Sequence, residues 1–186
     1  ALDFFSGSGT LADAVMQLNS EDGGNRKYIM VQLPEDLDEN YKKASDKEKV
    51  IITNAIELCE TLSVSHLLTE VAKERIRRAG KKIKEEHPEA KDLDTGFRVF
   101  KCESSNYKDV AFAPKDYNQA QLDLFEDNIK EDRTDLDLLF DCMLRWGVTL
   151  DLPMTKTKVD GCTIHNVNEG GLVACFDGKV TEQVIN

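Results

Sequence analysis

The sequence predicts an α/β first half, residues 1–95, followed by an α+β second half, residues 96–186. The chain begins with a short apolar run that ends in a glycine-rich turn directly before helix-forming residues. A second strand-like run follows that helix, which is the order of elements typical of parallel sheets. At Gly96 the pattern changes to strand-like alternation, one amphipathic helix and turn dipeptides, which together indicate a separate subdomain.

In the first half, the elements are predicted from hydrophobic periodicity and from the residues that interrupt it. We expect strands at 2–5 and 27–33 and helices at 10–19, 54–60 and 66–86. Apolar residues at helical spacing predict the buried face of the first helix: Leu11, Ala14, Val15 and Leu18. The polar segment from Pro34 to Lys49 is predicted to be a loop with a helical turn, and Pro88 with the charged run to Asp94 ends this half.

In the second half, alternation at 97–102 predicts a strand with one buried face, and residues 109–132 are expected to form a long acidic loop or frayed helix. An amphipathic helix over 135–146 ends at Gly147. Strands at about 157–160, 162–167 and 171–176 are separated by turn dipeptides at 160–161 and 170–171, which predict hairpins. The helix is expected to present five side chains to the core: Leu136, Leu139, Phe140, Met143 and Leu144.

The turn between the first strand and the first helix has the composition of a ligand-binding loop. Gly7 and Gly9 permit positive φ values, or a close approach of ligand and backbone, that a side chain would prevent. The helix that follows directs unpaired backbone N–H groups toward the same place. The sequence therefore predicts a ligand at this loop.

Three classes of nucleotide site are compatible with a glycine loop, and the neighbouring residues distinguish them. A phosphate-binding P-loop needs a Lys and a hydroxyl after its last glycine, whereas Thr10 and Leu11 follow Gly9. The dinucleotide pattern is satisfied by Gly7, Gly9 and Ala12, but the second strand ends at Gln32 and has no carboxylate for a ribose before Glu35. S-adenosylmethionine requires an acid on the strand and an aromatic residue beside the loop, and Asp3 and Phe5 supply these.

Composition sets further limits on function. A content of 40% hydrophobic residues suffices for a core, and no apolar run approaches the roughly 20 residues of a membrane span. The five cysteines are odd in number and widely spaced, which favours reduced thiols and a cytoplasmic protein. The net charge of −11 opposes DNA binding by this chain alone. Basic residues from Lys73 to Lys84 are expected to form a solvated helix face or, as the alternative, to contact phosphates.

The segments LDFFSGSGT, LADAVMQLN and GGNRKYIMVQLPE resemble the cofactor-binding motif and next strand of bacterial amino-methyltransferases that act on DNA adenine. Together with KERIRRAGKKI, DTGFRVFKCESSNY, DLLFDCMLRWG and GGLVACFDGKVTEQVI, they resemble the modification subunit of type III restriction–modification systems over most of the chain. The resemblance implies a partial Rossmann-like, S-adenosylmethionine-dependent methyltransferase fold followed by the α+β subdomain. It also implies methyl transfer to the N6 amino group of adenine in DNA, a restriction subunit as partner, and a homodimer in the intact enzyme.

The resemblance, together with the loop chemistry, assigns cofactor binding to nine residues: Asp3, Phe5, Ser6, Gly7, Ser8, Gly9, Thr10, Gln32 and Glu35. Alternatives remain for several of them. Asp3 either contacts the methionine amino group or orients the glycine turn, and Phe5 either packs near the cofactor or fills the core. Thr10 either bonds the cofactor carboxylate or caps the helix. The ribose is assigned partly to Gln32 and partly to Glu35.

The catalytic motif of that family, Asp-Pro-Pro-Tyr or a close variant, does not occur in this sequence. The four prolines stand singly, at Pro34, Pro88, Pro114 and Pro153. We therefore expect no catalytic residue here, and we expect the chain to be the C-terminal part of a longer enzyme and inactive alone. Cys162 and His165 have a spacing that suits two zinc ligands, but no second pair lies nearby, so no metal site is expected.

Two other function classes stay open from the sequence. A nicotinamide-dependent oxidoreductase would use the same glycines. A non-catalytic assembly module would use the helix at 135–146 and the terminal hairpins for subunit contacts.

Overall fold

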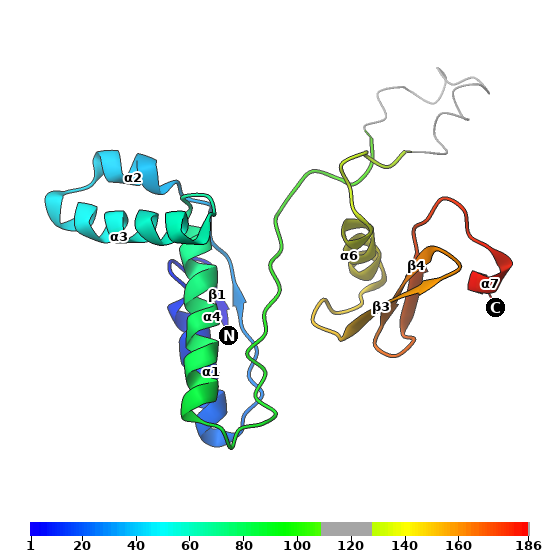
Figure 1. Ribbon diagram of the computed structural model, residues 1–186, viewed down its shortest axis with the longest axis horizontal. Coiled ribbons are helices and arrows are strands. Elements are labelled where there is room, and N and C mark those ends of the chain that lie inside the picture. Colours follow the sequence, from blue (N-terminus) through cyan, green and yellow to red (C-terminus); the bar gives the residue numbers. More distant parts are fainter. Residues whose placement is uncertain (109–127, 186) are drawn as a thin grey trace. The chain divides into compact units, whose positions relative to one another are not determined.

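The computed structural model describes residues 1–108 and 128–185, and these form two compact units, Ala1–Phe97 and Arg98–Asn186 (Figure 1). Most of the acidic segment expected at 109–132 lies outside the described residues. Among the described residues, no helix is both long enough and apolar enough to cross a bilayer. Each unit is described separately below.

In the first unit, a short parallel pair of strands is followed by helices. β1 (Leu2–Asp3) pairs with β2 (Ile29–Met30), with Leu2 opposite Ile29 and Asp3 opposite Met30. Both strands lie within the predicted ranges but are shorter than predicted. In the described part of the chain, no third strand pairs with β1 or β2. The sheet therefore contains only the few backbone hydrogen bonds between these two strands.

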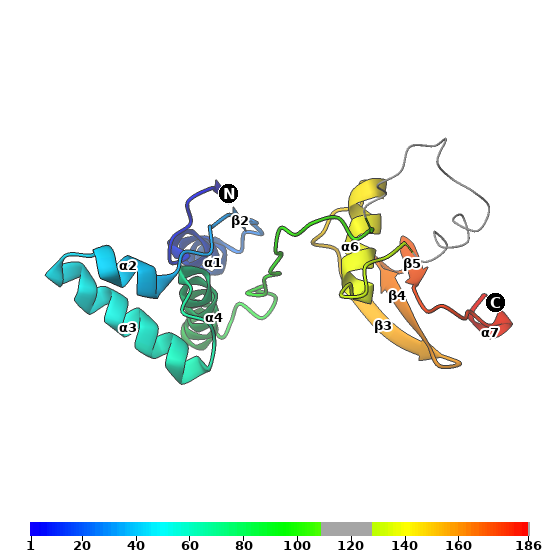
Figure 2. The ribbon, with the colours of Figure 1, turned by 90° about the horizontal axis from the view of Figure 1, so that it is seen from above.

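The core of this unit lies between α1 (Thr10–Asp22) and α4 (Leu68–Glu86), which run side by side (Figures 1 and 2). Ala12 and Met16 of α1 pack with Ile76 and Ile83 of α4. Both isoleucines of α4 are buried, at 3% and 2% exposure. The predicted stripe on α1 is partly wrong, because α4 covers the side of Ala12 and Met16 and leaves Ala14 and Leu18 exposed.

The segment 34–49, predicted to be a loop, is mostly helical. It contains α2 (Leu37–Lys43) and the start of α3 (Asp46–Leu62), which is also longer than predicted. Asp36 caps α2 by accepting hydrogen bonds from the backbone N–H groups of Asp38 (2.8 Å) and Glu39 (3.0 Å). At the start of α3, the Glu48 carboxylate accepts from Ser45 N at 2.9 Å. These caps pair N–H groups that would otherwise lack a partner at the start of a helix. Polar capping residues therefore stabilise both helices.

The second unit is built from α6 (Asp135–Trp146), packed on an antiparallel sheet in the order β3–β4–β5. The strands are β3 (Met154–Val159), β4 (Cys162–Val167) and β5 (Leu172–Cys175), and α7 (Glu182–Ile185) follows. The Asp-Gly turn is confirmed by positive φ values at Asp160 (49°) and Gly161 (87°), as a two-residue hairpin requires. The second turn is formed mainly by residues 168–170, slightly before the predicted dipeptide.

The face of α6 that meets the sheet was only partly predicted. Leu139 and Met143 are fully buried and pack with Val167 and Leu172 of the sheet. Leu138 is buried as well, whereas Leu136 and Leu144 are 48% and 64% exposed, contrary to prediction. The sheet covers only part of the helix face formed by the five predicted apolar residues. Leu136 and Leu144, at the edges of that face, therefore stay in contact with solvent.

The predicted strand at 97–102 is absent from the described structure, where this segment is irregular. Phe97 packs against the core of the first unit, whereas side chains rather than ladder hydrogen bonds hold the residues from Arg98 onward within the second unit. The Arg98 guanidinium donates to the carbonyl oxygens of Leu150 and Leu152, and Phe100 meets Phe140 edge to face at 4.9 Å between ring centroids. The alternating residues of this segment therefore hold it in place through side-chain contacts. In the described structure, no neighbouring strand pairs with it.

Candidate functional site

The loop between β1 and α1 is closed by backbone hydrogen bonds. Ser6 N donates to Val31 O at 3.2 Å, and Gly9 N donates to Ser6 O at 2.8 Å. Gly7 has φ of 51° and Gly9 has φ of 83°, so both glycines occupy the left-handed region that other residues avoid. The loop therefore lies against the end of the second strand and has the backbone conformation expected from its glycines.

The two glycines differ in what surrounds them. A Cβ at Gly9 would lie 3.3 Å from both Ala72 O and Ile76 Cγ1 on α4, whereas a Cβ at Gly7 would meet no atom within 4 Å. Gly9 is therefore needed for the packing of α1 on α4, a structural role beyond the ligand-binding role predicted for it. Gly7 borders open space, which is where a ligand could approach the backbone.

The N-terminus of α1 faces the loop without a side-chain cap. Gly9 is the N-cap residue, and within the described structure no side chain accepts from the first turn of this helix. Thr10 is the first helical residue and is exposed, so the alternative that it caps the helix is wrong. The helix dipole and the free N–H groups favour a negatively charged or hydrogen-bond-accepting group at this point.

Asp3 and Phe5 take different positions relative to the loop. The Asp3 carboxylate accepts a hydrogen bond from Phe5 N at 3.0 Å through Oδ1, so it orients the turn. Within the described residues its Oδ2 accepts no hydrogen bond, so this oxygen can still accept one from a ligand. The Phe5 side chain is 90% exposed, so the alternative that it fills the core is wrong in this chain.

Gln32 ties the end of the second strand to the glycine loop. Its Oε1 accepts from Gly7 N at 2.8 Å, and its Nε2 donates to Leu33 O at 3.2 Å and to the Glu35 carboxylate at 3.1 Å. The oxygen that was expected to accept from a ribose therefore already accepts from the loop backbone. A side chain in this arrangement positions the loop and aligns Glu35.

Glu35 is held from two sides. Asn40 Nδ2 donates to Glu35 Oε2 at 3.2 Å, and the backbone of Glu35 accepts from Leu68 N at 3.0 Å. Each carboxylate oxygen therefore has one amide donor and keeps further acceptor capacity. Among the residues assigned to the ribose, Glu35 has the larger unused acceptor capacity. Asn40 was not singled out from the sequence, because it lies in the segment predicted to be a loop.

Arg75 of α4 also reaches the glycine loop. Its guanidinium donates from Nη1 to Ser8 Oγ at 2.8 Å, across 67 positions in the sequence. Ser8, one of the expected cofactor residues, is therefore a contact point between loop and helix. The sequence contained Arg75 in the basic cluster but offered no sign that it is directed at the loop.

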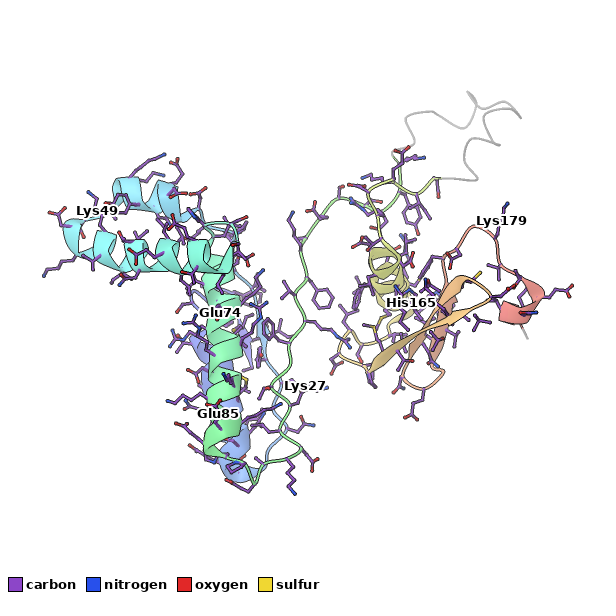
Figure 3. All side chains as sticks on the ribbon, in the orientation of Figure 1. Lys27, Lys49, Glu74, Glu85, His165 and Lys179 are labelled. Atoms are coloured by element: carbon purple, nitrogen blue, oxygen red, sulfur yellow. The ribbon has the colours of Figure 1, made fainter. Side chains whose placement is uncertain are left out.

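Most of the remaining basic side chains of α4 pair with acids on the same helix. Lys73 contacts Glu70 at 2.6 Å, and Arg78 contacts Glu74, labelled in Figure 3, at 2.7 Å. Lys81 and Lys82 lie within 4 Å of acids one turn away. This supports the interpretation of the cluster as a solvated helix face, since pairs of this spacing are typical of exposed helices.

A shallow hollow of about 350 Å³ lies between α1, α3 and α4, apart from the loop residues expected to bind cofactor. None of those residues lines it. Arg75 lines this hollow and also donates the hydrogen bond to Ser8 of the loop. The lining residues are Asp13, Leu58, Val71, Glu74, Arg75, Arg78, Ala79 and Lys82.

Cys162 and His165 do not form the metal pair that their spacing suggested. They lie three residues apart on β4, so their side chains project from opposite faces of the sheet. His165 is 3% exposed, and its Nε2 lies 3.6 Å from Asp135 of α6 (Figure 3). Burial at the interface between helix and sheet accounts for this histidine.

The chain is 38% identical over 102 residues to the type III restriction-modification enzyme StyLTI Mod subunit of Salmonella typhimurium. The matched part is 54% of this chain and 13% of the relative, so the chain spans a small part of the length of that protein. No family model and no solved structure matches the chain. Over about half of its length, this chain is thus similar to the Mod subunit of a type III restriction-modification enzyme.

Proposed function

We propose that this chain is part of a site-specific DNA adenine-N6 methyltransferase, the modification subunit of a type III restriction–modification system, and that it contributes the S-adenosylmethionine-binding loop. The observation that carries the proposal is the similarity to a Mod subunit, together with a glycine loop that is open at Gly7 and at the start of α1. The partial Rossmann-like fold belongs to the same proposal.

The loop chemistry suits a ligand that lacks phosphate. The amino-acid part of S-adenosylmethionine carries one carboxylate and one ammonium group. The free N–H groups at the start of α1, with the hydroxyls of Ser8 and Thr10, would donate hydrogen bonds to the carboxylate. The second carboxylate oxygen of Asp3 would accept from the ammonium group, and the exposed Phe5 ring would pack beside the cofactor.

The ribose assignment follows from the hydrogen bonds around Gln32. Because Gln32 Oε1 accepts from Gly7 N, we assign the ribose hydroxyls chiefly to Glu35 and make Gln32 a positioning residue. In this proposal Gln32 sets both the glycine loop and the Glu35 carboxylate. Ser6, whose buried backbone closes the loop, acts through the loop as well.

The reacting groups on the base are assigned to the rest of the longer protein. Methyl transfer requires the adenine amino group to be held in line with the sulfonium methyl, and the base must leave the helix stack to reach it. No motif for that task occurs in this sequence. With a net charge of −11, this chain is also expected to contribute little to DNA affinity.

The first unit has exposed apolar side chains that a larger sheet would cover. Leu2, Phe4, Ile29 and Leu33, all on or beside the two strands, are between 57% and 73% exposed. Large apolar side chains exposed on and beside two short strands are typical of a surface that is covered in the complete assembly. They support the proposal that other parts of a longer protein pack over β1 and β2.

The test is ligand-dependent stabilisation of the whole protein that contains these residues. S-adenosylhomocysteine should raise its thermal midpoint, because a ligand that binds only the folded state stabilises it by mass action. NAD at the same concentration should leave the midpoint unchanged. Stabilisation by NAD alone would replace the proposal with a nicotinamide-dependent enzyme.

Assembly is the second candidate function, and one observation favours it. Leu144 and Trp146 on α6 are 64% and 73% exposed, which suits contacts in a homodimer or with a restriction subunit. Size-exclusion chromatography of the whole protein with Leu144→Glu tests this role. A loss of the dimer with unchanged cofactor binding would assign α6 to assembly alone, whereas an unchanged dimer would remove that role.

A further inference from the structure

The second unit gathers two cysteines and an aspartate at the edge of its sheet. Cys175 on β5 is paired in register with Ile164 on β4, and Cys162 lies two residues before Ile164. Residues two apart on a strand share a face, so Cys162 and Cys175 project from the same face of the sheet. Asp177 follows β5, and one sulfur or oxygen atom from each of the three side chains lies within 4.8 Å of the other two.

This face is the one turned away from α6. Val167 packs with Leu139 of the helix and has the opposite parity on β4 from Cys162. Cys162 is nevertheless only 4% exposed, and its Sγ lies 3.2 Å from the carbonyl oxygen of Lys179, on the segment between β5 and α7 (Figure 3). The cluster therefore joins two strands and the segment that follows them.

The three groups already have defined positions. Asp177 Oδ2 accepts from Thr163 N at 2.6 Å, and the Cys175 thiol lies 3.7 Å from the same oxygen. Groups that can each carry a negative charge thus lie together on β4, on β5 and just after β5.

We infer that Cys162, Cys175 and Asp177 bind one Zn²⁺ ion. Zinc favours thiolate and carboxylate ligands in a tetrahedral arrangement, and a water molecule would complete the fourth position. Binding releases the two thiol protons to solvent, and the sulfur atoms then coordinate the metal as thiolates. The ion would fasten the segment around Lys179 to β4 and β5, and this role is independent of the proposed methyltransferase function.

From the sequence, no metal site was expected, because Cys162 and His165 had no second pair of ligands nearby. The zinc site inferred from the structure uses Cys162 with two other ligands. That expectation considered ligands close in sequence. Cys162 and Cys175 meet only because β4 and β5 form a hairpin, and Asp177 lies beyond the end of β5. The grouping depends on the hairpin register, which spacing along the chain does not reveal.

The test uses the full 186-residue chain, purified without a histidine tag, reduced and freed of metal. Titration with Co²⁺ should produce thiolate-to-cobalt charge-transfer absorption and tetrahedral ligand-field bands that saturate at one ion per chain. An equal amount of Zn²⁺ should abolish these bands, because zinc binds such sites more tightly. Zn²⁺ should also raise the thermal midpoint of the chain.

Variants identify the ligands. Cys162→Ser, Cys175→Ser and Asp177→Asn should each weaken Zn²⁺ binding by more than about tenfold, since even groups that only support ligands contribute 10- to 100-fold. Cys102→Ser, which changes an exposed cysteine outside the cluster, is the matched control and should leave the affinity unchanged.

Three results would overturn the inference. The first is a cobalt spectrum of the unmodified chain without thiolate bands, which decides the matter even if a variant fails to fold. The second is zinc affinity that Cys162→Ser and Cys175→Ser leave unchanged. The third is a disulfide between Cys162 and Cys175 that persists in the metal-free chain under thiol-reducing buffer, which would make the pair a cross-link.

Discussion

The two units of this chain bury their apolar side chains to different degrees. In the first, the strands β1 and β2 are two residues each, and Leu2 and Ile29 on them are 57% and 64% exposed. In the second, three antiparallel strands joined by tight turns place Val167 and Leu172 against α6. An antiparallel meander with a helix on one face is a self-sufficient arrangement, whereas a two-stranded parallel pair is not.

The difference matters for function, because the candidate ligand loop belongs to the less complete unit. The loop depends on β1, on the end of β2 and on α4, and the first two of these are held by few ladder hydrogen bonds. We therefore expect ligand binding to be sensitive to the surroundings of the first unit, and stability to be sensitive to the core of the second.

The largest effect is expected in the core of the second unit. Met143→Ala should lower the free energy of unfolding by about 2–5 kcal/mol, because the side chain is fully buried and its removal leaves a cavity. Leu144→Ala, one position along the same helix and 64% exposed, should change it by less than about 0.5 kcal/mol. Urea unfolding measures both, and equal effects would show that the unit lacks the core described here.

The next largest effects are expected from alanine substitutions at the two glycines of the loop, which should differ in their effects on stability and on cofactor binding. Gly9→Ala should destabilise the first unit by about 2 kcal/mol, since a methyl group there has an unfavourable φ and crowds Ala72 and Ile76. Gly7→Ala should cost about 1 kcal/mol from φ alone and should mainly weaken cofactor binding. Thermal unfolding and calorimetric titration of the whole protein distinguish these outcomes. If Gly7→Ala is the more destabilising, the packing assigned to Gly9 is wrong.

A smaller effect is expected from Gln32. Gln32→Ala removes the acceptor for Gly7 N and should weaken binding of S-adenosylhomocysteine by about fivefold, equivalent to a net hydrogen bond of about 1 kcal/mol. Gln32→Glu keeps an acceptor for Gly7 N and should retain more of the affinity than the alanine variant. Isothermal titration of the whole protein measures both variants. Unchanged affinity for Gln32→Ala, with a loss for Glu35→Ala, would assign the ribose to Glu35 without help from Gln32.

The smallest effect concerns pH and the start of α6. The Thr134 backbone N–H, and then its hydroxyl, donate to the carboxylate of Asp137 and hold its pKa below the ordinary value of an aspartate. A carboxyl whose pKa is lowered by folding stabilises the folded state above its unfolded pKa, and this contribution is lost as the pH falls through the folded pKa. Asp137→Asn should therefore cost about 0.5 kcal/mol at pH 7, and the difference should shrink below about pH 4.

Urea unfolding of both proteins at several pH values checks this expectation. Thr134→Val is a useful companion, because it removes the hydroxyl partner and leaves the carboxylate. A stability difference for Asp137→Asn that stays constant from pH 7 to pH 3 would show that the carboxylate does not act through its charge.

Features set by local sequence were predictable. The turn at Asp160 and Gly161 needs two adjacent positive φ values, which Asp-Gly is suited to adopt, and Gly147 ends α6 in the left-handed conformation. The helix α2 carried a local signal that was missed, namely Asp36 as its cap. Capping residues inside a polar segment are therefore informative even where hydrophobic periodicity is weak.

Features set by distant contacts were not predictable from the sequence. The lengths of β1 and β2 depend on neighbouring strands, and the faces of α1 and α6 depend on how much of each helix its partner covers. The contact of Gln32 with Gly7 spans 25 positions, and that of Arg75 with Ser8 spans 67. Residue identities within the loop were visible, but the side chains that hold the loop from elsewhere depend on the tertiary fold.

The central claim is that this chain supplies the cofactor loop of a DNA adenine methyltransferase, and methyl transfer tests it most directly. The whole protein that contains these residues should transfer tritium from labelled S-adenosylmethionine to duplex DNA, and hydrolysis of that DNA should yield N6-methyladenine. The 186-residue chain alone should give no more than the no-enzyme background. Incorporation by the chain alone, or none by the whole protein under conditions where it is folded, would contradict the account.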